Sequence, residues 1–240
     1  MFKTTKKANK SFDWQEFINK QKQACKEPAL RRFYKTGFPE PETPIGEVPM
    51  MALDFETTGM DASKHTILSV GMVPFNLQSI RPAQGNYWVV KPQSSLREES
   101  IIYHRITHSE IEHAPQINEV LDDILDQLAG HIVVVHYHNI ERRFLDKTLI
   151  KNRGESCLFP MIDTMLIEAR FERVQRFQKL KRWFGIAPPS IRLDASRERY
   201  NLPSYSSHHA KVDALATAEL LQAQIARHYS PKTPIKELWT

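Results

Sequence analysis

The chain has 240 residues, 41% of them hydrophobic, which is enough for one α/β core with an appendage and disfavours two equal domains. Its formal net charge of +5 suits a polyanionic partner, although charge alone is weak evidence because many basic proteins bind no nucleic acid. Cys25 and Cys157 make no disulfide framework, and no apolar stretch approaches the ~20 residues that span a bilayer, so we expect a cytoplasmic protein without a membrane anchor or signal peptide.

Residues 1–47 differ in character from the rest of the chain. Apolar side chains at helical spacing predict a short helix over residues 13–25 that docks on the main body. A proline-rich segment with interspersed glutamates then predicts an extended connector. We therefore divide the chain into an N-terminal extension, residues 1–47, a main domain, residues 48–228, and a C-terminal tail, residues 229–240.

An α/β pattern begins at Val48. Residues 50–55 and 67–75 are apolar runs of strand length, and residues 87–90 add a third strand after a Gly85-Asn86 turn signal. Together these runs predict an antiparallel meander.

The second half of the main domain alternates helical and strand patterns. Residues 117–128 have the helical apolar period, and the wholly apolar run 132–135 is typical of a strand covered on both faces. Further helices are expected at about 141–151, 163–175 and 209–228, with shorter pieces near 178–184. A mixed sheet wrapped by helices is the natural result.

Two acids end the first strand, and strand geometry points Asp54 and Glu56 to the same face. Such a pair often marks only a solvated edge. The strand is apolar here, however, and burying unpaired carboxylates is costly, which favours a compensating cation. Thr57-Thr58-Gly59 then turns the chain beside the two acids.

Glu141 is the acid of the second segment. Asn139 can cap a helix whose first turn contains Glu141, beside the buried stripe of that helix. Taken alone, Glu141 is better explained by the helix dipole than by a metal.

The third segment opens the long helix predicted over residues 209–228. His209 would share a helical face with Asp213, whereas His208 suits the preceding loop. Helix geometry alone therefore does not choose His208, and a histidine at a helix start is more often a surface or capping residue.

These segments, taken in order, resemble a known family, the Asp-Glu-Asp-Asp-His (DEDDh) class of 3'-5' exonucleases, and within it the proofreading epsilon subunits of bacterial DNA polymerase III and their relatives. The resemblance covers about residues 48–228. Each motif is weak by itself, and their shared order is a strong signal. The matching segments are 54–59, 136–145, 162–164 and 208–214, with a further similarity at 104–107.

The resemblance implies a ribonuclease-H-like fold with a five-stranded mixed sheet, to which the helical N-terminal extension is added. It implies that Asp54, Glu56 and Asp213 hold a first Mg²⁺ or Mn²⁺ ion. Asp54 would also bridge to a second ion, which Glu141 would support directly or through water. The His-x₄-Asp pattern of the family selects His208 over His209 as the proton acceptor.

The family comparison also implies substrate contacts. Thr57, Thr58 and Gly59 would line the pocket for the terminal nucleotide, and Met60 stands where a leucine often wedges against the last base. One departure is that Glu141 replaces the usual aspartate, with Tyr137 in place of an asparagine. Because hard cations accept either carboxylate, Glu141 is kept as a ligand.

A basic and aromatic cluster could contact nucleic acid by neutralising phosphates and stacking on bases. For any single member, a solvated helix face with core aromatics is the better explanation. The cluster comprises Arg170, Phe171, Arg173, Arg176, Phe177, Lys179, Lys181, Arg182 and Trp183.

The sequence thus predicts a metal-dependent 3'-5' exonuclease that uses two Mg²⁺ or Mn²⁺ ions and releases nucleoside 5'-monophosphates. Its expected partners are nucleic acid 3' ends, with DNA favoured and single-stranded or frayed ends preferred, and a polymerase or repair protein. An exoribonuclease of the same fold and a weakly active, exonuclease-like nucleic-acid binder remain as alternatives.

Overall fold

The computed structural model describes residues 12–92, 106–174, 188–206 and 208–240, and its centre is one five-stranded sheet. The strands lie in the order β3-β2-β1-β4-β5. β1 pairs antiparallel with β2, and β2 with β3, whereas β4 runs parallel to both β1 and β5. The predicted meander and mixed sheet are therefore confirmed. The strand bounds are β1 Met50–Thr57, β2 Ile67–Phe75, β3 Asn86–Val89, β4 Ile132–Val135 and β5 Met161–Asp163.

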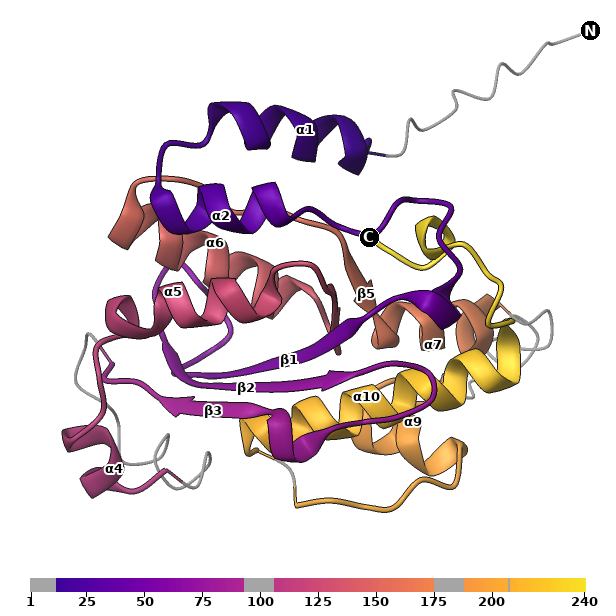
Figure 1. Ribbon diagram of the computed structural model, residues 1–240. Coiled ribbons are helices and arrows are strands. Elements are labelled where there is room, and N and C mark those ends of the chain that lie inside the picture. The colour runs from indigo at the N-terminus through magenta and orange to yellow at the C-terminus, as the bar shows by residue number, and fades with distance from the viewer. Residues whose placement is uncertain (1–11, 93–105, 175–187, 207) are drawn as a thin grey trace, which may run out of the picture.

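Helices cover both faces of this sheet (Figure 1). In the view shown, α1, α2, α5 and α6 lie above the strands, and α10 with α9 lies below them. The helix bounds are α1 Trp14–Ala24, α2 Pro28–Thr36, α4 His108–Glu112, α5 Ile117–Leu128, α6 Asn139–Arg153, α7 Thr164–Val174, α9 Leu193–Arg199 and α10 Ala210–His228, and the 3₁₀ turns are η1 Ile45–Glu47, η2 Pro82–Gln84 and η3 Ile235–Glu237.

Alternation along β1 divides the core in two. Met51, Leu53 and Phe55 pack in the cluster that also contains buried residues of α2, α5 and α6. Met50 and Ala52 pack in the other cluster, with the small and apolar face of α10. Because side chains alternate between faces, the next residues on the α10 side are Asp54 and Glu56. The fold thereby directs both acids toward the start of α10.

The N-terminal extension contains a second helix, α2, to which the sequence analysis assigned no element. Its signals are present in the sequence: Pro28 occupies the first turn, and Gly37 follows the last turn with φ of +82°. Phe33 and Tyr34 are fully buried, and the Tyr34 hydroxyl donates to the carbonyl of Leu158 at 3.0 Å. The extension therefore contributes to the main core.

The C-terminal tail is bound to the same body. Backbone bonds join Ile45 N to Thr233 O at 2.9 Å and Ile235 N to Thr43 O at 3.0 Å. Thr240 N donates to Met161 O at 2.8 Å, which fastens the end of the chain to edge strand β5. The division at residues 47 and 228 stays a prediction, since both flanking segments pack against the central domain.

Three elements, α4, α9 and β5, were not assigned from the sequence. Thr107 caps α4 through a reciprocal pair of bonds with Glu110, while residues 104–105 of the predicted turn and the helical pieces near 178–184 lie outside the described residues. Both cysteines are buried free thiols. Within the described ranges no helix combines the length and apolarity needed to cross a bilayer.

Candidate active site

The carboxyl end of β1 meets the start of α10 at a glycine. Gly71 of β2 lies opposite Asp54, and a Cβ atom there would come within 2.1 Å of the carbonyl carbon of Ala210 and 2.2 Å of Lys211 N. Only a residue without a side chain permits this approach. Gly71 therefore places α10 directly beside Asp54, a positioning role that sequence analysis missed.

His208 and Asp213 are joined at this helix start. His208 has a positive φ of 71°, uncommon for a residue with a side chain, and its backbone N–H donates to Asp213 Oδ2 at 2.9 Å. Ligand atoms of Glu56, His208 and Asp213 all lie within 4.8 Å of one another. Strained backbone at such a position is found where surrounding structure holds it for a functional arrangement.

The two adjacent histidines have different surroundings. The His209 ring stacks on Tyr87 of β3, with ring centroids 4.3 Å apart and an interplanar angle of 23°. The neighbouring Lys211 donates to the carbonyl of Gly85 at 2.8 Å, so both residues attach α10 to the β3 edge. His208, by contrast, belongs to the acidic group, a distinction that helix spacing alone does not make.

A pocket of about 320 Å³ opens over these acids. It is lined by Asp54, Phe55, Glu56, His136, Arg192, Leu193, Asp194, His208 and Asp213. Arg192 and Asp194 come from the start of α9, which sequence analysis did not predict. No local pattern marks them, because their approach to the acids depends on how α9 packs.

His136 helps to hold that segment in place. Its Nε2 lies 3.1 Å from the carbonyl oxygen of Ile191, and its Nδ1 lies 2.8 Å from Thr164 Oγ1. Burial lowers the pKa of His136 to about 4, which leaves the ring neutral at physiological pH. The histidine that opens the second motif therefore connects β4, α7 and the α9 segment.

Asp163, in the 162–164 segment, accepts hydrogen bonds that hold the surrounding backbone in place. Its Oδ1 accepts the N–H groups of Tyr137 and Met165 at 3.1 and 2.8 Å, and its Oδ2 accepts both His138 N and His138 Nδ1. Burial raises the pKa of Asp163, but the bonds from His138 and Tyr137 outweigh it, so the pKa is lowered. The carboxylate caps α7 and fixes the turn into α6.

Glu141 differs from Asp163 in having one carboxylate oxygen without a hydrogen-bond partner among the described residues. It is 2% exposed, and within the described part of the chain its Oε2 has no hydrogen-bond partner. Burial raises its pKa well above the ordinary value, and the charges of Asp163 and Glu56 raise it further, against hydrogen bonds from the N–H groups of Glu141 itself and Phe55. Glu141 is not among the residues that line the pocket, although its charge acts on Asp54, which does line it.

Asp54 interacts electrostatically with Glu141, Glu56 and Asp213. Burial raises the pKa of Asp54 well above its ordinary value. The charge of Glu141 adds the next contribution, followed by Glu56 and Asp213. Burial also raises the pKa of Asp213, to about 6, although the N–H groups of His208 and His209 lower it in part.

This group of acids fits divalent cations. Among the described residues, no lysine or arginine forms an ion pair with Asp54, Glu141 or Asp213. Close carboxylates repel one another, and burial makes that repulsion more costly. The unpartnered Glu141 oxygen and the convergent carboxylate oxygens of Glu56 and Asp213 offer the hard ligands that Mg²⁺ and Mn²⁺ prefer.

The predicted substrate residues surround the end of β1 and do not line the acidic pocket. Thr57 Oγ1 donates to Gly59 O at 2.9 Å, and Thr58 Oγ1 lies 3.2 Å from His65 Nδ1. Met60 is 72% exposed, so its side chain is available to a ligand. Contacts of these residues with a nucleotide stay predictions.

The basic cluster after residue 170 is described only in part. Arg170 Nη1 donates to the carbonyl of Glu237 at 2.9 Å, and Phe171 stacks on His228 with centroids 3.8 Å apart. These two residues attach α7 to the C-terminal region. Residues 175–187 and the side chain of Arg173 lie outside the described residues.

Comparisons with known proteins agree with this arrangement. The family model described as Exonuclease (RNase_T) matches residues 51–221, well over half of the chain. The chain belongs to this exonuclease family. The expected membership of the DEDDh class of 3'-5' exonucleases, similar to epsilon subunits, is confirmed. The coarse prediction of metal-dependent hydrolysis is likewise supported.

Two relatives and one structure illustrate the similarity. The exonuclease is 24% identical over 182 residues to the DNA polymerase III subunit epsilon of Treponema pallidum, covering 75% of this chain and 78% of that one. It is 27% identical over 179 residues to the PolC-type DNA polymerase III of Thermotoga maritima. The aligned residues make up 75% of this chain but only 12% of that much longer relative.

The fold resembles the nuclease domain of 3'hExo, a DEDDh family member bound to rAMP, with a TM-score of 0.61 and 16% identity over 75% of this chain and 92% of that one. At this identity the likeness shows the shared fold alone.

Proposed function

We propose that this exonuclease removes nucleotides from the 3' ends of DNA, with a preference for single-stranded or frayed ends, and releases nucleoside 5'-monophosphates. The observation that supports the proposal most is the convergence of Glu56, His208 and Asp213 within 4.8 Å, beside Asp54. DNA is favoured because the relatives that match most of the chain are named as DNA polymerase components.

The metal ligands belong to this proposal. Asp54, Glu56 and Asp213 would hold one Mg²⁺ or Mn²⁺, with Asp54 shared with a second ion and Glu141 supporting that second ion directly or through water. Divalent cations in this position would neutralise charge on the phosphate, lower the pKa of water and stabilise the leaving oxygen.

His208 would act as the general base. A neutral imidazole ring can accept a proton from the attacking water, and general-base assistance of this kind contributes ~10²–10⁴-fold. The Asp213 carboxylate orients the loop by accepting the His208 N–H at 2.9 Å. His136 and Asp163 act through the backbone, by holding the α9 segment and the α6 turn around the pocket.

Arg192 supplies a cationic group at the pocket. It is exposed and lines the same wall as Asp194, on the segment that His136 holds. A guanidinium can bind phosphate oxygens with two parallel N–H groups. We therefore place Arg192 against a phosphate of the bound strand, while Thr57, Thr58, Gly59 and Met60 contact the terminal nucleotide.

An exoribonuclease is the second candidate. The structural neighbour 3'hExo was solved with rAMP, which shows that this fold accommodates a ribonucleotide in that protein. RNA and DNA differ at the 2'-hydroxyl, for which the described pocket residues give no selection by themselves.

The test uses 5'-labelled DNA and RNA oligomers of identical sequence, incubated with Mg²⁺ or Mn²⁺ and with EDTA. The proposal expects a ladder shortening from the 3' end, faster on DNA, with mononucleotide products and no activity in EDTA. Faster shortening of RNA would move the assignment to the second candidate. Binding without cleavage would support the exonuclease-like binder.

A polymerase partner is also proposed, because the similar segment lies within a much longer polymerase chain in the PolC-type relatives. The expectation is that a replicative DNA polymerase co-elutes with the exonuclease and increases its removal of mismatched primer ends. No co-elution and no change in rate would overturn it.

A further inference from the structure

The β1–β2 loop, residues 58–66, carries Thr58, Gly59 and Met60 of the predicted nucleotide pocket. The ladder between β1 and β2 shifts register at the start of this loop, directly after Glu56. Irregularities of this kind redirect a strand next to an active site. Met60 is 72% exposed, so its position relative to the acids depends on how the loop itself is held.

The two halves of the β1–β2 loop are bonded to each other at its base. Thr58 N donates to Thr66 O at 2.9 Å, and Thr66 N donates to Thr58 Oγ1 at 3.1 Å. His65 Nδ1 lies 3.2 Å from the same hydroxyl oxygen. The His65 ring also covers Gly59, because a Cβ atom there would be 2.7 Å from the ring atoms Cε1 and Nε2. His65 therefore supports the half of the loop that leads to Met60.

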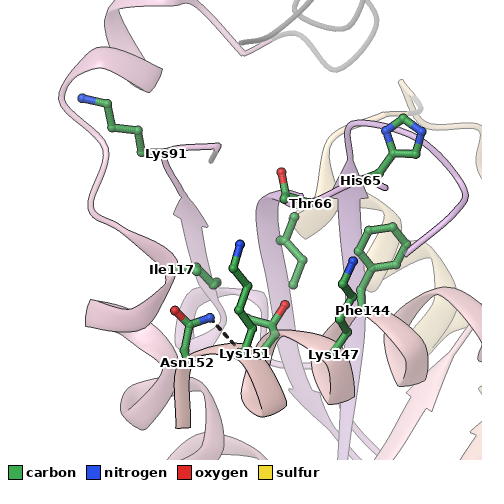
Figure 2. A pocket seen from close by; sticks show the side chains of 10 residues that line it. His65, Thr66, Lys91, Ile117, Phe144, Lys147, Lys151 and Asn152 are labelled. Carbon is green, nitrogen blue, oxygen red and sulfur yellow. Dashed lines mark hydrogen bonds between the residues drawn. The ribbon is translucent and has the colours of Figure 1, made fainter. Parts of the chain in front are cut away.

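The helix α6 holds the same loop beyond its tip. Ala62 is 9% exposed and belongs to the buried cluster that also contains Phe144 of α6. One turn further along this helix, Lys147 donates from Nζ to the carbonyl of Ala62. Figure 2 shows Lys147 pointing from α6 toward the side on which His65 lies. Because α6 also carries Glu141 in its first turn, Lys147 connects the β1–β2 loop with the helix of the second motif.

We propose that Lys147 and His65 are positioning residues, which fix the β1–β2 loop so that Met60 meets the terminal nucleotide of the substrate. The inference rests on the proposed exonuclease function, since the contact of Met60 with the nucleotide is part of it. A loop that is already ordered loses less conformational entropy when the substrate binds, so these two residues increase affinity. The described lining of the acidic pocket contains neither of them, and the chemical step keeps its rate without them.

The test combines each positioning variant with Met60→Ala. Lys147→Met removes the ammonium group and keeps the aliphatic stem, and His65→Ala removes the ring that covers the loop. Arg153→Met is the matched control, because Arg153 also lies on α6 and donates to a backbone carbonyl, that of Asn118 in α5, at 3.0 Å. KM and kcat are measured with Mg²⁺ on a 5'-labelled oligothymidylate, and thermal unfolding of every variant is recorded.

We expect Lys147→Met and His65→Ala each to raise KM about tenfold and to keep kcat within about twofold, because only binding is lost. Added to Met60→Ala, either substitution should raise KM less than about twofold further, since a displaced loop has already lost the Met60 contact. Lys147→Arg should restore KM, because a guanidinium can still donate to the Ala62 carbonyl. Arg153→Met should lower the unfolding temperature and leave KM unchanged.

Three results would overturn the positioning role while leaving the exonuclease in place: an unchanged KM in the positioning variants or in Met60→Ala, effects that multiply fully with Met60→Ala, or an equal rise of KM in Arg153→Met. The last result would show that KM follows overall stability. If Lys147→Met does not fold, His65→Ala and Lys147→Arg decide. An unmodified protein that releases no mononucleotide would overturn the proposed function, and this inference with it.

Discussion

Two groups of buried acids in this molecule differ in how well hydrogen bonds and ion pairs compensate their charge. Glu168, 1% exposed, is bonded to Arg199 Nε at 2.8 Å, Gln224 Nε2 at 2.8 Å and Tyr200 OH at 3.1 Å. Glu141 is almost equally buried, yet its Oε2 has no partner among the described residues and its pKa is raised. The protein neutralises one buried carboxylate internally and leaves the other in a group of like charges.

The contrast separates structural from functional acids. A buried charge is tolerated when protein donors satisfy it, as for Glu168 and Asp163. Among the described residues no lysine or arginine is paired with Asp54, Glu141 or Asp213, so we expect their ionised form to depend on cations from solution. Substitutions should therefore have opposite consequences in the two regions: lost stability at Glu168, and lost activity with little loss of stability at Asp54 and Asp213.

The largest effect is expected at the metal acids. Asp54→Ala or Asp213→Asn should abolish nucleotide release, because the ligands that position the cations are removed. Both proteins should unfold in a cooperative transition near that of the unmodified, metal-free protein, since mutual repulsion is relieved. Rates on labelled oligomers and thermal unfolding provide the check, and full activity in folded Asp54→Ala would contradict the metal assignment.

The adjacent histidines provide a matched pair. His208→Ala should slow turnover by ~10²–10⁴-fold through loss of the general base. His209→Ala removes only the stacking on Tyr87 and should change turnover much less. Single-turnover rates at saturating substrate measure both, and the reverse order would exchange the two assignments.

At Glu168, the acid that is paired with Arg199, a substitution should lower the stability of the protein. Glu168→Ala leaves Arg199 without its closer ion-pair partner and should lower the free energy of unfolding by about 3–5 kcal/mol. Glu172→Ala is the control, because that half-buried acid is 4.0 Å from the same guanidinium and should cost less than about 1 kcal/mol. Urea unfolding measures the free energy of unfolding of both variants. Equal losses in the two variants would contradict the assignment of Glu168 as the structural acid.

A smaller effect is expected from shortening Glu141. Glu141→Asp should reduce turnover about tenfold by withdrawing the carboxylate by one methylene, and Mn²⁺ should restore it better than Mg²⁺, whose octahedral geometry is stricter. Glu141→Gln should impair turnover more. Turnover rates measured against metal concentration test whether Glu141 is a metal ligand. If Glu141→Gln turned over substrate at the unmodified rate in limiting Mg²⁺, Glu141 would be a residue of the first helical turn without a role in metal binding.

Local signals predicted the meander β1 to β3 and the strand β4, whereas the five-stranded sheet was implied by the family resemblance and β5 was not assigned. Apolar runs fixed β1, β2 and β4, and alternation placed Asp54 with Glu56. The helix α2 was missed although its apolar spacing and its Pro28 and Gly37 boundaries were readable.

Other features depend on tertiary packing. Gly71 is informative only once α10 is known to cross it, and Arg192 and Asp194 reach the pocket only through the docking of α9. The partners of Asp163 come from a different motif, so its structural role could not be read from its own segment. Spacing alone also did not decide which of His208 and His209 belongs to the acidic site.

We expect Asp54, Glu141 and Asp213, which form no ion pair with a lysine or arginine among the described residues, to belong to a metal site. Calorimetric titration of Mn²⁺ at pH 6, in two buffers of different ionisation enthalpy, tests it directly. The pKa of Asp213 is raised to about 6, so at this pH its carboxyl is partly protonated and a bound cation must displace the proton. Burial raises the pKa values of Asp54 and Glu141 in the same direction.

We expect saturable Mn²⁺ binding with proton release that decreases as pH rises above the pKa of Asp213, and the loss of both in Asp213→Asn. Absence of saturable binding, or the same binding and proton release in Asp213→Asn, would contradict it.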